Sequence, residues 1–124
     1  MVDTGTTIFV VDDDDLVRDA LRALLKSAGF NAQVFESAQA FLDSDHQQRE
    51  GLLVLDVRIP GMNGLELQRH LADSGADMPI IFISAHEDAR AHKKAMEAGA
   101  LAFLQKPLDA RILFDAIERA PGQI

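Results

Sequence analysis

The sequence predicts a doubly wound α/β domain, in which a five-stranded parallel sheet carries helices on both faces. Two observations lead to this prediction. Short runs of Val, Ile and Leu alternate along the chain with stretches whose apolar residues recur at helical spacing. Most of the runs are apolar throughout, which is typical of strands buried on both faces in parallel sheets. Right-handed crossovers between successive strands then produce the doubly wound arrangement.

Three strands and two helices are predicted in the first half of the chain. The strands are the runs 8–11, 31–35 and 52–55, of which the second is the weakest. A helix follows the first run, because apolar residues recur there at helical spacing, and Gly29 is expected to end it. Ser37 is expected to cap the second helix.

The second half of the chain repeats this alternation. A turn at 60–64 precedes the third helix, and the strands are the runs 80–83 and 102–104. Gly99 is expected to end the fourth helix, and the Pro-Gly pair at 121–122 the fifth. The apolar positions that mark these three helices are Leu67 and Leu71, then Ala91, Ala95 and Ala98, and finally Ile112, Leu113, Ala116 and Ile117.

Length and charge narrow the classes of function. The 124 residues suit a single domain over 1–124, with a core of about 7–120 and a tail or start of a linker at 121–124. The net charge of −8 argues against nucleic acid binding by this domain. There is no cysteine, no apolar run long enough for a bilayer and no feature of a signal peptide. We therefore expect a cytoplasmic location and no membrane contact.

Polar side chains follow four of the five apolar runs. Asp12 and Asp13 follow the first run, Asp56 the third, Ser84 the fourth, and Lys106 comes shortly after the fifth. The ends of parallel strands share one edge of the sheet, where ligands bind in open α/β folds. Three carboxylates at this edge repel one another unless a cation lies among them, and Mg²⁺ prefers such oxygen ligands.

This set of residue types suits phosphoryl transfer. A carboxylate can act as a nucleophile and form an aspartyl phosphate. The transfer needs in-line positioning and positive charge around the phosphoryl oxygens, which Mg²⁺ and the Lys106 ammonium would supply, with the Ser84 hydroxyl as a further donor. The set contains no obvious general base for water, so we expect a long-lived acyl phosphate, as a signal requires.

The residues resemble the receiver domain of bacterial two-component response regulators, especially the FixJ-like branch, whose best-known members control nitrogen fixation. The motifs are VDD at 11–13, LDVRIPGMNG at 55–64, ISA at 83–85 and KP at 106–107. Each motif is weak alone, but together, in order and at strand ends, they are specific. The resemblance extends over about 7–120 and implies the flavodoxin-like strand order 2-1-3-4-5, as in CheY.

The resemblance also implies a role for each acidic residue of the set. Asp56 would be the phosphoacceptor. Asp12 and Asp13 would position Mg²⁺, for which Mn²⁺ is a substitute. Asp56 and the backbone carbonyl of Arg58 would complete the protein ligands of the metal.

Further roles follow for the second half of the chain. Ser84 would be the switch hydroxyl, and Lys106 would contact the phosphoryl group, with a cis peptide bond between Lys106 and Pro107. Phe103 stands where the family has its rotating aromatic residue. Phosphorylation would draw Ser84 towards Asp56, and Phe103 would turn into the vacated space.

The partners implied by the resemblance are a sensor histidine kinase as donor, a second copy of the chain and a C-terminal DNA-binding output domain. The second copy would pair through the face of the fourth helix and fifth strand after phosphorylation. On that helix His92, with Arg90, Lys93 and Lys94, makes a locally basic stretch. The domain would be a signalling switch rather than an enzyme, assisting only its own phosphorylation and slow dephosphorylation.

Other interpretations remain open from the residues. The main alternative is a Mg²⁺-dependent hydrolase with an aspartyl-phosphate intermediate, although Arg58 stands where such a phosphatase needs a second carboxylate. A receiver that works without phosphorylation is another. Asp14 and Asp15 are expected to be N-terminal helix carboxylates. His46 and His70 are expected at the surface, and His86 near the mouth of the site.

Overall fold

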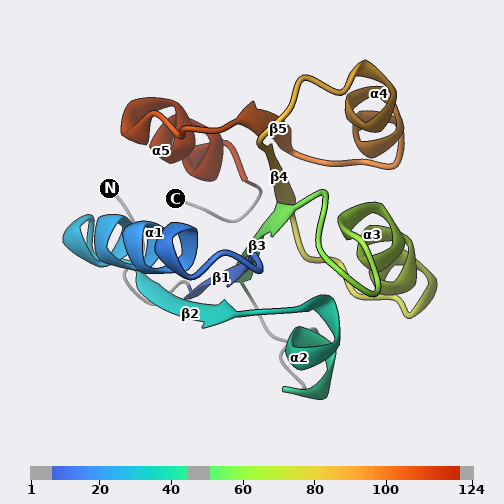
Figure 1. The fold of residues 1–124 in the computed structure, drawn as a ribbon, viewed down its shortest axis with the longest axis horizontal. Coiled ribbons are helices and arrows are strands. Elements are labelled where there is room, and N and C mark those ends of the chain that lie inside the picture. The colour runs from blue at the N-terminus through green and yellow to red at the C-terminus, as the bar shows by residue number, and fades with distance from the viewer. Residues whose placement is uncertain (1–6, 45–50, 121–124) are drawn as a thin grey trace.

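The computed structural model describes residues 7–44 and 51–120, and it confirms the predicted fold (Figure 1). Five parallel strands form one sheet in the order β2-β1-β3-β4-β5. Each strand is followed by a helix, and the sequence of elements is β1 Thr7–Val11, α1 Asp15–Ser27, β2 Asn31–Phe35, α2 Ala38–Asp43, β3 Gly51–Asp56, α3 Gly64–Asp73, β4 Ile80–Ser84, α4 Ala89–Glu97, β5 Ala102–Gln105 and α5 Ala110–Glu118.

The helices divide between the two faces of the sheet. Helices α1 and α5 cover one face, and α2, α3 and α4 cover the other (Figure 1). Two separate apolar cores result. The core under α1 and α5 contains Leu25 and Ile117, whereas the core on the opposite face contains Phe41, Leu67 and Ala95. Strands β1, β3 and β4 are buried from both sides, which explains why their sequences are almost continuously apolar. The edge strands β2 and β5 are partly exposed.

The local signals at the helix ends work as predicted. Ser37 caps α2, and its side chain accepts a hydrogen bond from the Ala40 N–H. Asp14 is the N-cap of α1, and Asp15 lies in the first turn of that helix. Gly29 and Gly99 follow the ends of α1 and α4 with φ values of +92° and +99°, a conformation that costs other residues strain.

Two predicted helix positions differ from the structure. Ala98 was expected on the buried face of α4, but it is the exposed C-cap residue because the helix ends at Glu97. Ile112 belongs to α5 but is 52% exposed. The buried residues of α5 are Leu113, Ala116 and Ile117, at positions i, i+3 and i+4, so Ile112 lies to one side of this stripe.

Several expectations concern residues that the structure does not describe. His46 and the segments 1–6 and 121–124 lie outside the described residues.

His70 is exposed, as expected. Within 7–44 and 51–120, no helix combines the length and apolar character needed to cross a membrane.

The strand register determines which strand ends become neighbours. Val11 pairs with Leu55, so the residues that follow them, Asp12 and Asp56, leave the sheet side by side. Asp56 in turn pairs with Ile83, immediately before Ser84. The carboxyl ends of β1, β3, β4 and β5 therefore meet at one edge, at the place where the strand order reverses.

Candidate functional site

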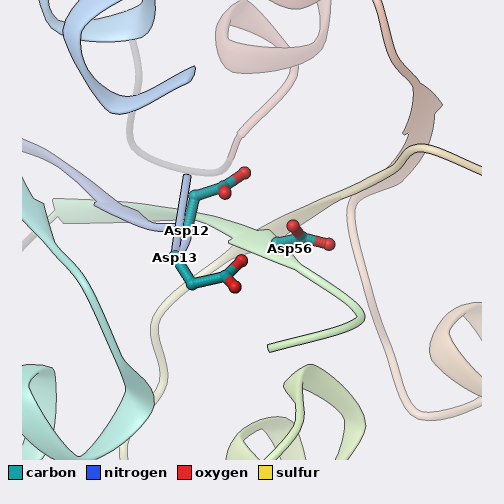
Figure 2. Close-up of side chains that lie close together, drawn as sticks. All are labelled: Asp12, Asp13 and Asp56. Atoms are coloured by element: carbon teal, nitrogen blue, oxygen red, sulfur yellow. The ribbon is translucent and has the colours of Figure 1, made fainter. Parts of the chain in front are cut away.

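Three carboxylates gather at this edge of the sheet. Asp12 and Asp13 follow β1, and Asp56 is the last residue of β3 (Figure 2). One carboxylate oxygen from each residue lies within 4.8 Å of the other two. Asp12 and Asp56 are buried, whereas Asp13 is exposed. The cluster is therefore open to solvent on the side of Asp13.

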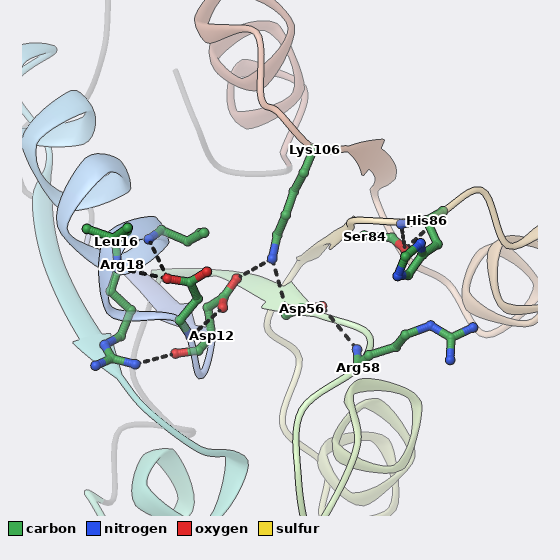
Figure 3. A network of polar contacts seen from close by, with 10 residues as sticks. Asp12, Leu16, Arg18, Asp56, Arg58, Ser84, His86 and Lys106 are labelled. Carbon is green, nitrogen blue, oxygen red and sulfur yellow. Dashed lines mark hydrogen bonds and ion pairs between the residues drawn. The ribbon is translucent and has the colours of Figure 1, made fainter.

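Lys106 reaches into the cluster from the segment after β5 (Figure 3). Its Nζ atom lies 2.8 Å from Asp12 Oδ2 and 2.9 Å from Asp56 Oδ2. The bond to Asp56 is a hydrogen bond, whereas the contact with Asp12 is an ion pair without hydrogen-bond alignment. The following peptide bond, Lys106–Pro107, is cis. One ammonium thus bridges two buried carboxylates.

Backbone groups hold the other oxygen of each buried carboxylate. Asp12 Oδ1 accepts a hydrogen bond from the Asp14 N–H at 2.9 Å, and Asp56 Oδ1 accepts one from the Arg58 N–H at 3.0 Å. The Arg18 guanidinium donates to the Asp12 carbonyl at 2.8 Å. These bonds orient both carboxylates before any ligand binds, because each carboxylate is held at two points.

Burial and neighbouring charges together shift two pKa values in the cluster. Burial raises the pKa of Asp56, and the Asp12 charge raises it further. The hydrogen bonds from Lys106 and the Arg58 N–H oppose this shift, but the pKa remains above its ordinary value. Burial lowers the pKa of Lys106, but the Asp12 and Asp56 carboxylates outweigh that effect and leave it raised. The lysine therefore stays charged, while the raised pKa of Asp56 shows that its negative charge is incompletely compensated.

The residues present fit a divalent cation. Asp12 Oδ2 is buried and has no hydrogen-bond partner in the described part of the chain, although the Lys106 ammonium lies beside it. One ammonium cannot balance three carboxylates, so the site has a net negative charge. All the side-chain ligands are oxygen atoms, which Mg²⁺ prefers over nitrogen or sulfur. Asp12, Asp13 and Asp56 are thus a suitable side-chain ligand set for Mg²⁺.

Ser84 stands at the end of β4, next in the sheet to Asp56. Its side chain is buried, and its hydroxyl donates to the His86 carbonyl at 2.7 Å and accepts from the His86 N–H at 3.2 Å. No hydrogen bond between Ser84 and Asp56 is found. His86 itself is exposed beside the site. The hydroxyl thus holds the β4–α4 loop rather than the carboxylate.

Phe103 lies on β5 between the sheet and α4. Its ring stacks on the buried Phe82 with centroids 6.1 Å apart, and on His92 with centroids 4.7 Å apart and planes only 3° from parallel. Phe103 is partly buried and packs against the core under α4. The ring therefore connects α4 with the strand that leads to Lys106.

Asp88 is a site neighbour that sequence reasoning missed. It caps α4 by accepting a hydrogen bond from the Ala91 N–H at 3.0 Å, and its other oxygen lies 2.8 Å from the Arg58 guanidinium. An Asp just before the small-residue face of a predicted helix could have been recognised as an N-cap. Its pairing with Arg58 could not, because the two residues are 30 positions apart.

A groove opens beside the carboxylates, with a volume of about 520 Å³. Asp13 and Arg58 line the end nearest the cluster, and Asp88 and Lys94 line the side of α4. The apolar residues that line it come from the β3–α3 loop and from helices α3 and α4, and include Ile59, Pro60, Leu65 and Ala91. The groove therefore meets the carboxylate cluster at Asp13.

Comparison with known proteins places this site in context. Residues 8–118 match the model of the response regulator receiver domain family. The chain is 46% identical over 116 residues to the transcriptional regulatory protein TdiR of Thauera aromatica. This alignment covers 94% of this chain and 51% of TdiR. It is 41% identical over 117 residues to the transcriptional regulatory protein FixJ of Rhizobium meliloti, covering 94% of this chain and 57% of FixJ.

The solved structures agree with the sequence matches. The crystal structure of FixJ-N superposes with a TM-score of 0.86 at 40% identity, covering 96% of this chain and 94% of that one. By contrast, the chain spans only about half the length of TdiR and FixJ. The matches therefore cover one part of each of those regulators, but they include nearly the whole of this chain.

Proposed function

Because the chain belongs to the response regulator receiver domain family, we propose that it is a phosphorylation switch whose phosphoacceptor is Asp56. The observation that supports this assignment most strongly is the position of Lys106. Its ammonium contacts Asp56 Oδ2 and Asp12 Oδ2 together, at 2.9 and 2.8 Å, beside the groove that leads to solvent. Asp56 accepts hydrogen bonds from the lysine and from the Arg58 N–H, so both of its carboxylate oxygens are held in place.

The proposed donor is a phosphohistidine of a sensor histidine kinase. A carboxylate oxygen of Asp56 attacks the phosphorus atom, and the phosphorus–nitrogen bond breaks with its electron pair moving to the imidazole. Lys106 lies where it can neutralise negative charge on a phosphoryl oxygen. Asp12, Asp13, Asp56 and the Arg58 carbonyl would hold Mg²⁺, or Mn²⁺ in its place. When bound, the ion supplies further positive charge to the phosphoryl oxygens.

The switch that follows uses Ser84 and Phe103. A phosphoryl group on Asp56 offers the Ser84 hydroxyl a stronger acceptor than the His86 carbonyl, which it contacts now. Movement of Ser84 towards Asp56 would release the β4–α4 loop and leave space for the Phe103 ring. Because Phe103 stacks on His92 of α4, this rotation would change the α4–β5 surface.

The wider role of the chain is also a proposal. TdiR and FixJ are named as transcriptional regulatory proteins, so we propose a C-terminal DNA-binding output domain in the full regulator. The receiver unit would occupy 1–124 and would not bind DNA itself, in keeping with its net charge of −8. A phosphorylation-dependent dimer would use the α4–β5 face. A regulator of transcription acts where the DNA is, so we place it in the cytoplasm.

Intact-mass spectrometry tests the phosphoacceptor directly. The wild-type chain is incubated with a small acyl-phosphate donor, with and without Mg²⁺, and compared with Asp56→Asn. We expect one added phosphoryl group, which requires Mg²⁺ and is absent from the variant. An adduct that persists in Asp56→Asn would move the acceptor to another residue. No adduct on a folded wild type would leave a hydrolase or a receiver that works without phosphorylation.

A further inference from the structure

Arg58 contacts two separate parts of the molecule. Its backbone N–H donates to Asp56 Oδ1 at 3.0 Å, at the end of β3. Its guanidinium lies 2.8 Å from Asp88 Oδ2, at the start of α4. The side chain therefore spans the groove beside the carboxylates and connects the β3–α3 loop with the opposite helix.

Asp88 is itself firmly held. Its Oδ1 atom accepts a hydrogen bond from the Ala91 N–H at 3.0 Å and so caps α4. This hydrogen bond lowers the pKa of Asp88 below its ordinary value, and the Arg58 charge lowers it further, so the carboxylate is charged. Oδ2 is left free to face the guanidinium. Arg58 is thus attached to a fixed point of the fold rather than to a mobile side chain.

We propose that Arg58 is a positioning residue for the phosphoacceptor site, and that its ion pair with Asp88 fixes the backbone of the β3–α3 loop at residue 58. The inference rests on the proposed function for the identity of the site. The loop carries the N–H that holds Asp56, and its carbonyl at residue 58 is the expected backbone ligand of the metal. The ion pair would therefore keep the N–H and the carbonyl of Arg58 in place, although neither of the two charged side-chain groups would contact the metal.

The size of the effect follows from the exposure of the pair. The side chains of Arg58 and Asp88 are 61% and 22% exposed. Ion pairs with this degree of solvent contact are weak, so we expect their loss to lower Mg²⁺ affinity by roughly two- to fivefold, not to abolish binding. An effect this small can be confused with the loss of a nearby charge, and the experiment must separate the two.

Opposite charges within the pair make this separation possible. Arg58→Met removes a positive charge and keeps most of the apolar stem, so a pure charge effect would tighten Mg²⁺ binding. Asp88→Ser removes a negative charge and keeps an N-cap hydroxyl, so a pure charge effect would weaken binding. If positioning dominates, both variants bind Mg²⁺ more weakly, and the double variant is no weaker than the single variants.

The control is Lys94→Met. Lys94 lines the same groove and makes no ion pair within residues 7–44 and 51–120, so its removal reports the charge effect alone. Mg²⁺ dissociation constants are measured by NMR titration of backbone amides. The Arg58 amide proton, which is bonded to Asp56, should also shift in Asp88→Ser, although residue 88 is 30 positions away.

The outcomes decide between this inference and the proposed function. Weaker binding in both variants with an unchanged or tighter Lys94→Met supports the positioning role. Opposite shifts in Arg58→Met and Asp88→Ser overturn it, even if the wild type accepts a phosphoryl group. A wild type that binds Mg²⁺ but accepts no phosphoryl group overturns the proposed function, and the ion pair then positions a metal site only. A wild type that binds no Mg²⁺ overturns the positioning role.

Discussion

Ser84 is the hydroxyl that we propose moves between two alternative structures. Its Oγ atom makes two hydrogen bonds to the backbone of His86, and these satisfy it fully in the present structure. The neighbouring strand β3 carries Asp56, so in the proposed switch the movement of Ser84 would bring its hydroxyl to a phosphoryl oxygen on Asp56. A hydrogen bond to a charged acceptor is stronger than one to a carbonyl, which supplies the driving force for the change.

At the residue scale we therefore predict that Ser84→Ala still allows phosphorylation of Asp56 but prevents the change of the α4–β5 surface that follows it. Beryllium trifluoride, which mimics a phosphoryl group, should still bind at Asp56 in the presence of Mg²⁺, as seen by ¹⁹F NMR. The amide NMR signals of α4 and β5 should stay where they are in the absence of beryllium trifluoride, because the hydroxyl that would move the loop is missing. Ser84→Thr keeps the hydroxyl and should respond as the wild type does. A full α4 response in Ser84→Ala would contradict the switch.

The start of α3 shows how elements constrain the site. The Gly64 N–H donates to the Val57 carbonyl at 2.9 Å, and the Asn63 and Glu66 side chains form a capping box around this first turn. A Cβ atom on Gly64 would lie 2.6 Å from the Asp56 carbonyl oxygen and 3.0 Å from Val57 Cα. Both neighbours are backbone atoms, so they cannot move away cheaply.

At the element scale we predict that Gly64→Ala displaces the end of β3. Overpacking of this kind costs about 1–3 kcal/mol in the free energy of unfolding, and here it should also weaken Mg²⁺ binding because Asp56 moves. Gly75→Ala is the control. Gly75 has a φ of +80° but open space around its Cβ position, so alanine there should cost stability of about 1 kcal/mol and leave Mg²⁺ binding unchanged.

Urea unfolding and Mg²⁺ titration of the two glycine variants make the comparison. If both variants lose stability and neither loses Mg²⁺ affinity, then the contact between α3 and β3 does not position Asp56. If only Gly64→Ala loses affinity, the close approach of the two elements is a requirement of the site.

For the molecule as a whole, folding concentrates negative charge at one place. The chain has a net charge of −8, and the fold brings one carboxylate oxygen from each of Asp12, Asp13 and Asp56 within 4.8 Å of the other two. The Lys106 ammonium contacts two of these three residues. The unfolded chain keeps Asp56 far from the other two. A cation that binds this cluster therefore binds the folded state in preference to the unfolded state and stabilises it.

We predict that Mg²⁺ raises the stability of the whole domain. At a concentration one hundredfold above its dissociation constant, the free energy of unfolding should rise by about 2.7 kcal/mol. In the presence of a chelator, Asp13→Asn should be at least as stable as the wild type, because one of the three mutually repelling carboxylates is removed. Mg²⁺ should raise its free energy of unfolding by less than it does for the wild type. Asp19→Asn, an exposed change on α1 outside the cluster, should gain as much as the wild type.

Urea midpoints measured in chelator and across a Mg²⁺ series provide the test. Equal midpoints for the wild type at all Mg²⁺ concentrations would show that the cluster does not bind the ion. Equal gains for Asp13→Asn and the wild type would remove Asp13 from the ligand set while leaving the site itself in place.

Much of the fold was predictable from local patterns. Continuous apolar runs, helical spacing and cap residues such as Ser37 and Gly29 depend on the conformation of a few neighbouring residues, so they can be read without the tertiary structure. The residues at the strand ends were predictable for a related reason. All strands of a parallel sheet end at one edge, so Asp12, Asp56 and Lys106 had to come near one another once the fold class was known.

The sequence by itself thus determined the elements, their order and the residue types at the edge of the sheet. The tertiary structure decided the contacts between distant elements, such as the pairing of Arg58 with Asp88 and the stacking of Phe103 on His92. It also decided that Asp12 is buried while Asp13 is exposed, and that Ile112 faces solvent. Such features depend on how separate elements pack in space, and a helical period or a cap residue carries no information about the neighbour across the groove.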